Sequence, residues 1–439
     1  MKKIFLSLGL LFMGGVGVVS AQHIEFEEYT LSNGLHVILH QDKSVPVVTT
    51  SVMYHVGAKD EQPDRTGFAH FFEHLLFEGT ENIGRGDWFK IVSANGGQNN
   101  ANTSDDRTYY YETFPSNNLQ LSLWMEAERM LHPVINQIGV DTQREVVKEE
   151  KRLGVDNRPY GRLFEAVKSN IFKHHPYRWT TIGDMDHIDA ATLAEFQAFF
   201  KKFYIPNNAV LVVAGDFDKA QAKKWIDEYF ASIPKGADIV RKQYTEEPIT
   251  KQINAKFEDE NIQIPMLLNV YRTPSFKERD TYALDLVSDV LSSGKSSRLY
   301  RRLVDKEKTA LDVSSFIYPQ EDYGTYFIYG LPMTGKTMED MQISIDEEVN
   351  RICTELITED EYQKLLNKVE NSVVSQNSST DGVAHNLATY YLLYKDVNLI
   401  NKEIDIYRSI TREEIRDVAK KYLKPNQRLV LDYVPKNAE

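Results

Sequence analysis

The side chains best suited to chemistry lie within five consecutive residues, His70-Phe71-Phe72-Glu73-His74. On an α-helix, residues at i, i+3 and i+4 share one face, so both imidazoles and the carboxylate project to the same side. Two imidazoles one turn apart can bind one zinc ion, and a nearby carboxylate that is not a ligand can accept a proton from water. The order reverses the more familiar His-Glu-x-x-His but presents the same groups. The segment predicts a metal site with Glu73 as general base; the alternative is a helix with two hydrogen-bonded histidines.

A catalytic zinc usually takes three protein ligands, so this hypothesis requires a third residue elsewhere. The predicted helix 141–153 has an apolar stripe that we assign to Val146, Val147 and Leu153. At about 100° per residue, Glu150 falls in the middle of that stripe. A carboxylate in a packed interface is costly unless it is paired or bound to metal. Glu150 is therefore the predicted third ligand, and a salt bridge is the alternative.

Strands and helices are mixed among the elements around these residues. β-branched and alternating patterns predict strands over residues 27–39 and 47–55. Apolar periodicity predicts helices over residues 67–77, 119–131 and 141–153. This mixture indicates an α+β class, with helices packed on a mainly antiparallel sheet.

An internal repeat divides the chain. Residues 201–207 match residues 420–426 at an offset of 219, and each match follows an amphipathic helix and precedes an aliphatic strand. We interpret this as duplication, with convergent helix-Pro-Asn-strand punctuation as the alternative. The expected domains are 23–235, which carries the metal site, and 262–439, which lacks one. The polar segment 236–261 between them is the expected linker.

Residues 1–21 combine a basic start, an apolar run and a small-residue end, which is typical of a cleaved secretory signal. The alternative is an uncleaved membrane anchor. No other stretch is long and apolar enough to cross a bilayer. A single cysteine, Cys353, means that an exported chain is held together without internal disulfides, which favours a bacterial periplasm or secretion.

Net charge excludes one class of partner. The full chain carries a formal charge of -13, which argues against binding to nucleic acid. If the acidic excess lines a cleft, it favours basic peptide substrates.

Four separate segments carry one family resemblance: residues 70–80 together with Glu150, and residues 96–110, 175–177 and 296–300. They resemble the M16 zinc peptidases, the pitrilysin, insulinase and mitochondrial processing peptidase family, over essentially the whole mature chain. The resemblance implies a bacterial half-length catalytic subunit with two homologous α/β-sandwich domains. It also implies one zinc ion per chain, held by His70, His74 and Glu150.

The resemblance further implies how substrate is bound. Asn100 and Ala101 match the family's Asn-Ala strand, whose edge accepts the backbone of a peptide as an extra strand. Main-chain pairing of this kind suits extended peptides with little regard for their side chains. The alternative for Asn100 is an ordinary turn or strand-end residue.

The chain departs from the family pattern at two places. Gln143 stands where many active members have a glutamate, two turns before the third ligand, and is expected to support the metal ligands. Val304 and Leu311 occupy the positions of an Arg and a Tyr that hold substrate in active members. We therefore expect a zinc-dependent endopeptidase that is one subunit of a heterodimer, whose partner supplies the Arg and Tyr. The alternatives are a non-catalytic assembly or chaperone-like subunit, and a homodimeric oligopeptidase.

Overall fold

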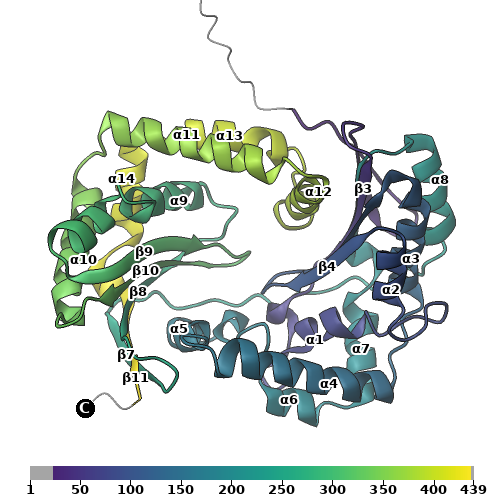
Figure 1. Cartoon of the computed structure of the whole chain (residues 1–439), viewed down its shortest axis with the longest axis horizontal. Helices are drawn as coiled ribbons and strands as arrows, with labels where there is room; N and C mark the ends of the chain where they lie inside the picture. The colour runs from purple at the N-terminus through teal and green to yellow at the C-terminus, as the bar shows by residue number, and fades with distance from the viewer. Residues whose placement is uncertain (1–22, 437–439) are drawn as a thin grey trace, which may run out of the picture.

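A computed structural model describes residues 23–436, which form two β-sheets covered by helices (Figure 1). The expected signal segment 1–21 lies outside the described residues. The first sheet has six strands in the order β1-β2-β6-β3-β5-β4. They are β1 (Glu27–Thr30), β2 (His36–Gln41), β3 (Val47–Tyr54), β4 (Gln98–Thr103), β5 (Thr108–Pro115) and β6 (Ala209–Gly215). β2 and β6 are parallel, and the other neighbouring strands are antiparallel. β4 stands last in the strand order, so it forms one edge of the sheet.

The second sheet has five strands in the order β7-β11-β8-β10-β9. They are β7 (Ile253–Asp259), β8 (Met266–Thr273), β9 (Ala310–Tyr318), β10 (Gly324–Pro332) and β11 (Arg428–Pro435). Its single parallel pair is β7 with β11. The order and directions repeat those of the first sheet without β1, which confirms the expected α+β fold of two related halves.

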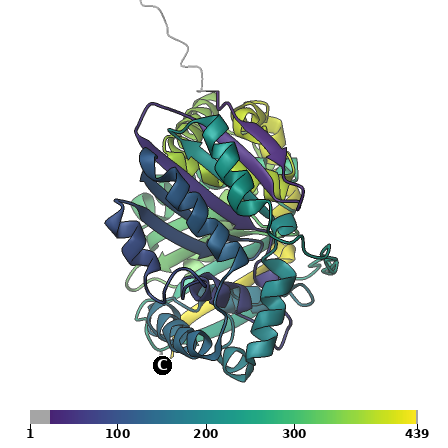
Figure 2. The same cartoon turned by 90° about the vertical axis from the view of Figure 1, so that its right-hand side faces the viewer.

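Helices pack on both sheets, and Figure 2, which faces the first half, shows helices lying across its strands. The first half contains α1 (Phe68–Leu75), α2 (Trp88–Ala94), α3 (Leu119–Leu131), α4 (Gln137–Lys151), α5 (Leu163–Ile171), α6 (Met185–Ala190), α7 (Leu193–Phe203) and α8 (Lys219–Phe230). The second contains α9 (Arg279–Ser292), α10 (Met338–Thr354), α11 (Glu359–Gln376), α12 (Thr380–Thr389), α13 (Leu399–Arg408) and α14 (Arg412–Tyr422). None of the described helices is long and apolar enough to span a membrane.

The repeat that the sequence indicates is visible in the strand register. Thr192 caps α7 and Thr411 caps α14, and each helix leads through a Pro-Asn turn into a strand, β6 or β11. Val210 of β6 pairs with β2, and Leu429, 219 residues later, pairs with β7 in the same parallel sense. Duplication explains this shared register better than convergent turn chemistry.

Each half also covers the sheet of the other half. Val383 and Leu387 of α12 pack with Val212 on one face of the first sheet. Val167 of α5 packs with Leu268 on one face of the second sheet. In Figure 1, α12 lies beside β3 and α5 lies near β7 and β8. The two halves therefore share apolar cores, because one face of each sheet is covered by a helix from the other half.

The expected linker 236–261 is wrong at its C-terminal end, because it includes β7 (Ile253–Asp259). This strand alternates half-buried apolar residues with exposed polar ones, as an edge strand does, and its charges resemble those of a linker. The second half therefore begins at residue 253 and not at 262.

The single strand expected over residues 27–39 is also wrong. A turn separates β1 from β2, and it includes Gly34 with a φ of 90°. A Cβ atom at this position would lie 2.7 Å from the Cβ of Asn207, so the glycine allows both the left-handed turn and the close approach.

A buried ion cluster joins the halves. Glu321, in the β9–β10 turn, accepts hydrogen bonds from Lys59 Nζ at 2.6 Å and from His55 Nε2 at 2.7 Å. Lys59 Nζ also lies 3.1 Å from Asp106, in the β4–β5 turn. Burial opposes ionisation of Glu321, but the hydrogen bond from His55 and the charge of Lys59 hold the pKa of this carboxyl well below its usual range.

We expect Glu321→Gln to lower the free energy of unfolding by about 3 kcal/mol near neutral pH, because it removes the charge that accepts hydrogen bonds from both Lys59 and His55. The native pKa of Glu321 is depressed, so its contribution is complete above the unfolded value of about 4.3 and is lost as the pH falls further. Urea unfolding of both proteins between about pH 7 and about pH 2 measures this, because the window must extend well below the unfolded pKa of about 4.3. An equal difference at every pH would contradict the assignment.

Candidate metal and catalytic site

The backbone at the start of α1 fixes where the predicted metal helix begins. Gly67 precedes the helix with a φ of 88°, a conformation that favours glycine. A Cβ atom on Gly67 would lie 2.7 Å from the carbonyl oxygen of Ile182, in a neighbouring loop. The chain therefore turns into α1 at a point where only the smallest residue fits against that loop.

Aromatic packing fixes the rotation of α1 about its axis. Phe68 and Phe71 stack on Phe196 of α7, with ring centroids 4.7 and 4.6 Å apart. Phe72 stacks on Phe199 at 5.6 Å. Because this face of α1 lies against α7, the helical period turns the face with His70, Glu73 and His74 away from that contact.

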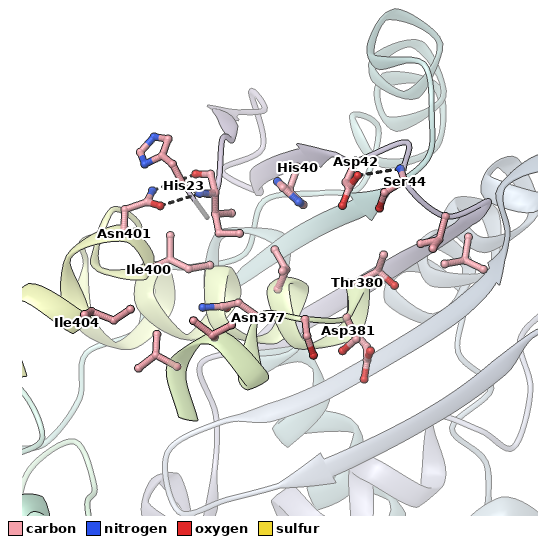
Figure 3. Close-up of a pocket in the computed structure, with 18 of the residues that line it drawn as sticks. His23, His40, Asp42, Ser44, Asn377, Thr380, Asp381, Ile400, Asn401 and Ile404 are labelled. Carbon is pink, nitrogen blue, oxygen red and sulfur yellow. Dashed lines mark hydrogen bonds between the residues drawn. The ribbon is translucent and has the colours of Figure 1, made fainter. Parts of the chain in front are cut away.

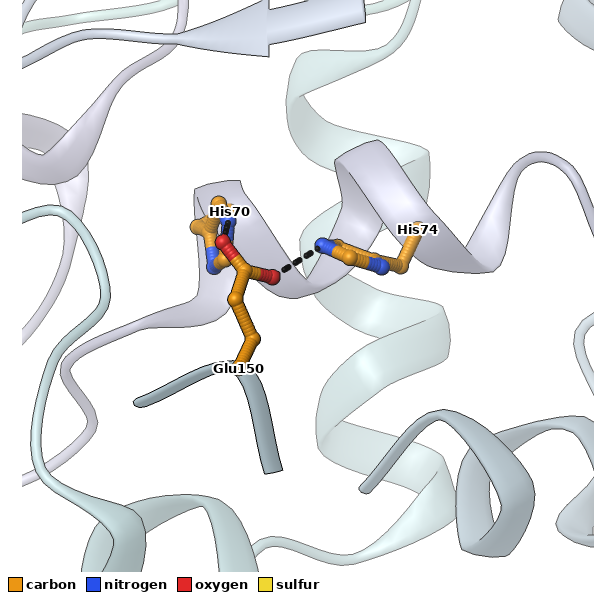
Figure 4. A group of neighbouring side chains, drawn as sticks. All are labelled: His70, His74 and Glu150. Atoms are coloured by element: carbon orange, nitrogen blue, oxygen red, sulfur yellow. Dashed lines mark ion pairs between the residues drawn. The ribbon is translucent and has the colours of Figure 1, made fainter. Parts of the chain in front are cut away.

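The structure brings His70, His74 and Glu150 together, with Glu150 approaching from α4 (Figure 4). His70 Nε2 lies 3.4 Å from Glu150 Oε1, and His74 Nε2 lies 3.0 Å from Glu150 Oε2. The hydrogen bonds of Glu150 with His70 and then His74 hold the pKa of its carboxyl well below its usual range. Glu150 is thus a carboxylate facing two imidazole nitrogens.

This donor set fits a zinc ion. The three ligand atoms all lie within 4.8 Å of one another, and among residues 23–436 no other group of His, Cys, Asp or Glu meets this condition. Tetrahedral bonds of about 2.0–2.1 Å place neighbouring ligand atoms about 3.3 Å apart, which is close to both measured contacts. Nitrogen and carboxylate oxygen are ligands that zinc accepts, and three of them leave a position for water or substrate.

The packing argument that predicted Glu150 as the third ligand is partly wrong. Val147 is buried, but Val146 and Leu153 are 43% and 58% exposed, so they do not form an apolar stripe. The side chain of Glu150 is 46% exposed and lies at an open site rather than in a packed interface. Helical phase still directs the side chain of Glu150 toward α1, because the buried Val147 lies one turn earlier on the same face of α4.

Glu73 has a partner that the sequence analysis did not identify. The hydroxyl of Thr103, the last residue of β4, donates a hydrogen bond to Glu73 Oε2 at 2.6 Å. Thr103 thus holds one oxygen of the predicted base. Its place two residues after Ala101, on the same face of the strand, is the sequence signal that could have found it.

Asn100 and Ala101 lie on β4, the edge strand beside α1, as expected. Asn100 is exposed, whereas Ala101 is buried and contributes to the first core. The N–H of Ala101 donates to Asn100 Oδ1 at 2.9 Å. An edge strand offers unpaired backbone groups, and substrate binding by these two residues stays a prediction.

The three remaining positions that the sequence analysis named are Gln143, Val304 and Leu311. Gln143 Nε2 donates to Glu78 Oε1 at 2.5 Å, which ties α4 to the segment that follows α1. Val304 is half-buried against the second core, and Leu311 on β9 is 41% exposed.

A cavity of about 310 Å³ opens beside His70 and Glu150. Phe164, Ile182 and Tyr318 also line it, and Tyr318 belongs to β9 of the second half. Both halves of the chain therefore form the surroundings of the metal ligands.

A larger cavity, of about 930 Å³, lies between the β2–β3 turn and helices α11 to α13 (Figure 3). Its labelled residues include His40, Asp42, Asn377 and Asp381, and none of the three metal-ligand candidates lines it. It is a separate feature from the candidate metal site.

Two family profiles match the chain. Insulinase (Peptidase family M16) matches residues 36–185, and Peptidase M16 inactive domain matches residues 190–369. The first match contains His70, His74 and Glu150. The second begins within the first structural half and continues into the second half.

Individual relatives agree with the profiles. The chain is 31% identical over 407 residues to the zinc protease PqqE of Helicobacter pylori, with 91% of each protein covered. It is 27% identical over 403 residues to an uncharacterized zinc protease of Mycobacterium leprae, covering 90% of this chain and 88% of that protein.

Two solved structures show the same fold. A protease from Helicobacter pylori superposes with a TM-score of 0.88 at 30% identity, covering 94% of this chain and 100% of the other. The periplasmic protease PqqL of Escherichia coli has a TM-score of 0.80 at 20% identity, covering 95% of this chain but 48% of that one. By profile, sequence and fold, the chain belongs to peptidase family M16.

Proposed function

We propose that this protein is a zinc-dependent endopeptidase that hydrolyses extended peptides or unfolded segments. The observation that carries the proposal is the convergence of His70, His74 and Glu150 beside Glu73, whose carboxylate is held by Thr103. The name zinc protease given to its relatives supports the same chemistry.

Different residues of the site take different roles in the proposed hydrolysis. His70, His74 and Glu150 would hold a zinc ion, which when bound supplies a Lewis acid for the scissile carbonyl and lowers the pKa of water. Glu73 accepts the proton of the attacking water and then passes it to the leaving amine, so one carboxylate acts as base and then as acid. Thr103 keeps one oxygen of Glu73 in place, and the β4 edge binds the substrate backbone next to α1.

We further propose that the chain works as one subunit of a larger assembly, exported to the periplasm or beyond the cell. It covers 48% of PqqL, so a chain of about this length corresponds to half of a longer M16 protein. Val304 and Leu311 offer no charged or hydroxyl group where the family resemblance implies an Arg and a Tyr. A second M16-like chain would supply those groups.

Mass measurement in solution, metal analysis and a quenched-peptide assay on the purified chain test this. Full activity as a monomer or homodimer would contradict the heterodimer, and the homodimeric form would be an oligopeptidase. Zinc binding without activity, even with an M16-like partner that carries the Arg and Tyr, would favour a non-catalytic subunit. The absence of an Arg and a Tyr, with Val304 and Leu311 in their places, is the observation that favours this second candidate.

Removing one imidazole should remove the metal. We expect His74→Ala to lower the zinc content from one ion per chain toward none after dialysis, because only two ligands remain. Elemental analysis measures this. His132→Ala is a matched control, since His132 bonds to Glu128 away from the site, and equal zinc content in both variants would contradict the ligand assignment.

Glu73→Gln should abolish hydrolysis while zinc remains bound, because an amide of nearly the same shape cannot accept the proton of water. Initial rates with a quenched peptide and parallel zinc analysis measure the two effects. Glu145→Gln, at an exposed position on α4, is expected to leave both unchanged. Retained turnover in Glu73→Gln would exclude Glu73 as the base.

Thr103→Val keeps the shape of the side chain but removes the hydrogen bond to Glu73. We expect kcat to fall by about 10-fold or more, because hydrogen bonds to charged groups are each worth about 1.5–3 kcal/mol. KM should change little, and Thr103→Ser should retain most of the activity. If the serine variant loses as much as the valine variant, the hydroxyl is not the group that matters.

A further inference from the structure

Glu61 lies close to the start of the metal helix and is buried, with 3% exposure. Its Oε2 accepts the N–H of Gly67 at 2.9 Å, and its Oε1 accepts the N–H of Ala69 at 2.9 Å. Both oxygens of one carboxylate thus bind backbone donors at the N-terminus of α1. Burial raises the pKa of Glu61, whereas these two hydrogen bonds lower it, and burial has the larger effect.

The start of α1 lacks a cap of its own. The first N–H groups of any helix have no partner within the helix, and they usually bond to a Ser, Thr, Asp or Asn side chain at the N-cap. The N-cap here is Gly67, which has no side chain. Glu61 supplies the missing acceptors from outside the helix, one carboxyl oxygen for the N–H of Gly67 and the other for the N–H of Ala69.

Backbone hydrogen bonds hold the segment that immediately precedes Glu61. It follows the short helix Ala58–Asp60, whose backbone is tied to the β4–β5 turn by Ala58 N–H to Ser104 O at 3.2 Å and Lys59 N–H to Asp105 O at 2.9 Å. The side chain of Lys59 binds Glu321 of the second half at 2.6 Å. The carboxylate that caps α1 is therefore anchored to the same turn that follows Thr103, and through Lys59 to the other half.

We propose that Glu61 is a positioning residue for the metal site, acting through the N-terminal turn of α1 on the orientation of His70. This inference rests on the proposed zinc function. α1 begins at Phe68, so its first turn includes His70, which directly follows Ala69 and its capped N–H. Loosening that turn moves one of the two imidazoles relative to Glu150.

The test replaces Glu61 by Gln in the full chain and compares it with a matched variant elsewhere. Glu246 is also buried, with 6% exposure, and also caps backbone, accepting the N–H groups of Lys173, His174 and His175 at 2.8, 2.6 and 2.7 Å. Glu246→Gln therefore controls for the general cost of removing a buried capping carboxylate.

Two measurements separate positioning from stability. Hydrogen–deuterium exchange of the metal-free chain, followed in peptides over residues 65–75, should be faster in Glu61→Gln and unchanged in Glu246→Gln. Zinc affinity, measured by competition with a chromophoric chelator, should fall by about 10- to 100-fold in Glu61→Gln alone. Glu61→Asp keeps the carboxyl group but shortens its reach, so its values should lie between those of the wild type and Glu61→Gln. It replaces the Gln variant if that variant does not fold.

Unchanged exchange over residues 65–75, or an equal loss of zinc affinity in the Glu246 control, would overturn the proposal. A wild-type chain that binds no zinc would contradict the proposed function separately. The exchange experiment would then decide alone whether Glu61 orders the turn that carries His70.

Discussion

The candidate metal site depends on one requirement: a carboxylate from α4 must meet two imidazoles from α1. The two helices are far apart in the sequence, and the contact between Glu150 and His74 at 3.0 Å exists only if both keep their rotation and position. Stacked aromatic rings fix the rotation of α1 against α7. The position of α1 is fixed at its start, where Gly67 fits against a neighbouring loop and Glu61 binds two N–H groups.

The second half contributes to this geometry although its own residues provide no metal ligand among those described. It covers the first sheet with α12, lines the cavity next to His70 with Tyr318, and binds Lys59 through Glu321. Lys59 lies two residues before Glu61, and the β4–β5 turn that it contacts follows Thr103. The second half therefore supports the site through these contacts, although it holds none of the three candidate ligands.

Local patterns in the sequence predicted much of this arrangement. Helical spacing grouped His70, Glu73 and His74, and the repeat at 219 positions predicted that two related halves share one topology. Glu150 was selected with an apolar stripe of which only Val147 is buried, so its helical phase was right although the packing argument was not. The family resemblance pointed to the same residue independently.

Other features could not be predicted, because they depend on contacts between distant segments. Glu61 is an ordinary polar residue in the sequence, and only the fold brings it to the start of α1. The exchange of α5 and α12 between the halves leaves no local signal, since an amphipathic helix does not specify which sheet it covers. β7 was assigned to a linker because an edge strand with charged outer residues has the composition of one.

The central claim is that His70, His74 and Glu150 bind one zinc ion. X-ray diffraction from crystals of the protein, purified without chelators and measured on both sides of the zinc absorption edge, tests it most directly. The account predicts one anomalous peak that disappears below the edge, within bonding distance of His70 Nε2, His74 Nε2 and the Glu150 carboxylate. Anomalous density at another position, or none between these three side chains after zinc is added, would contradict it.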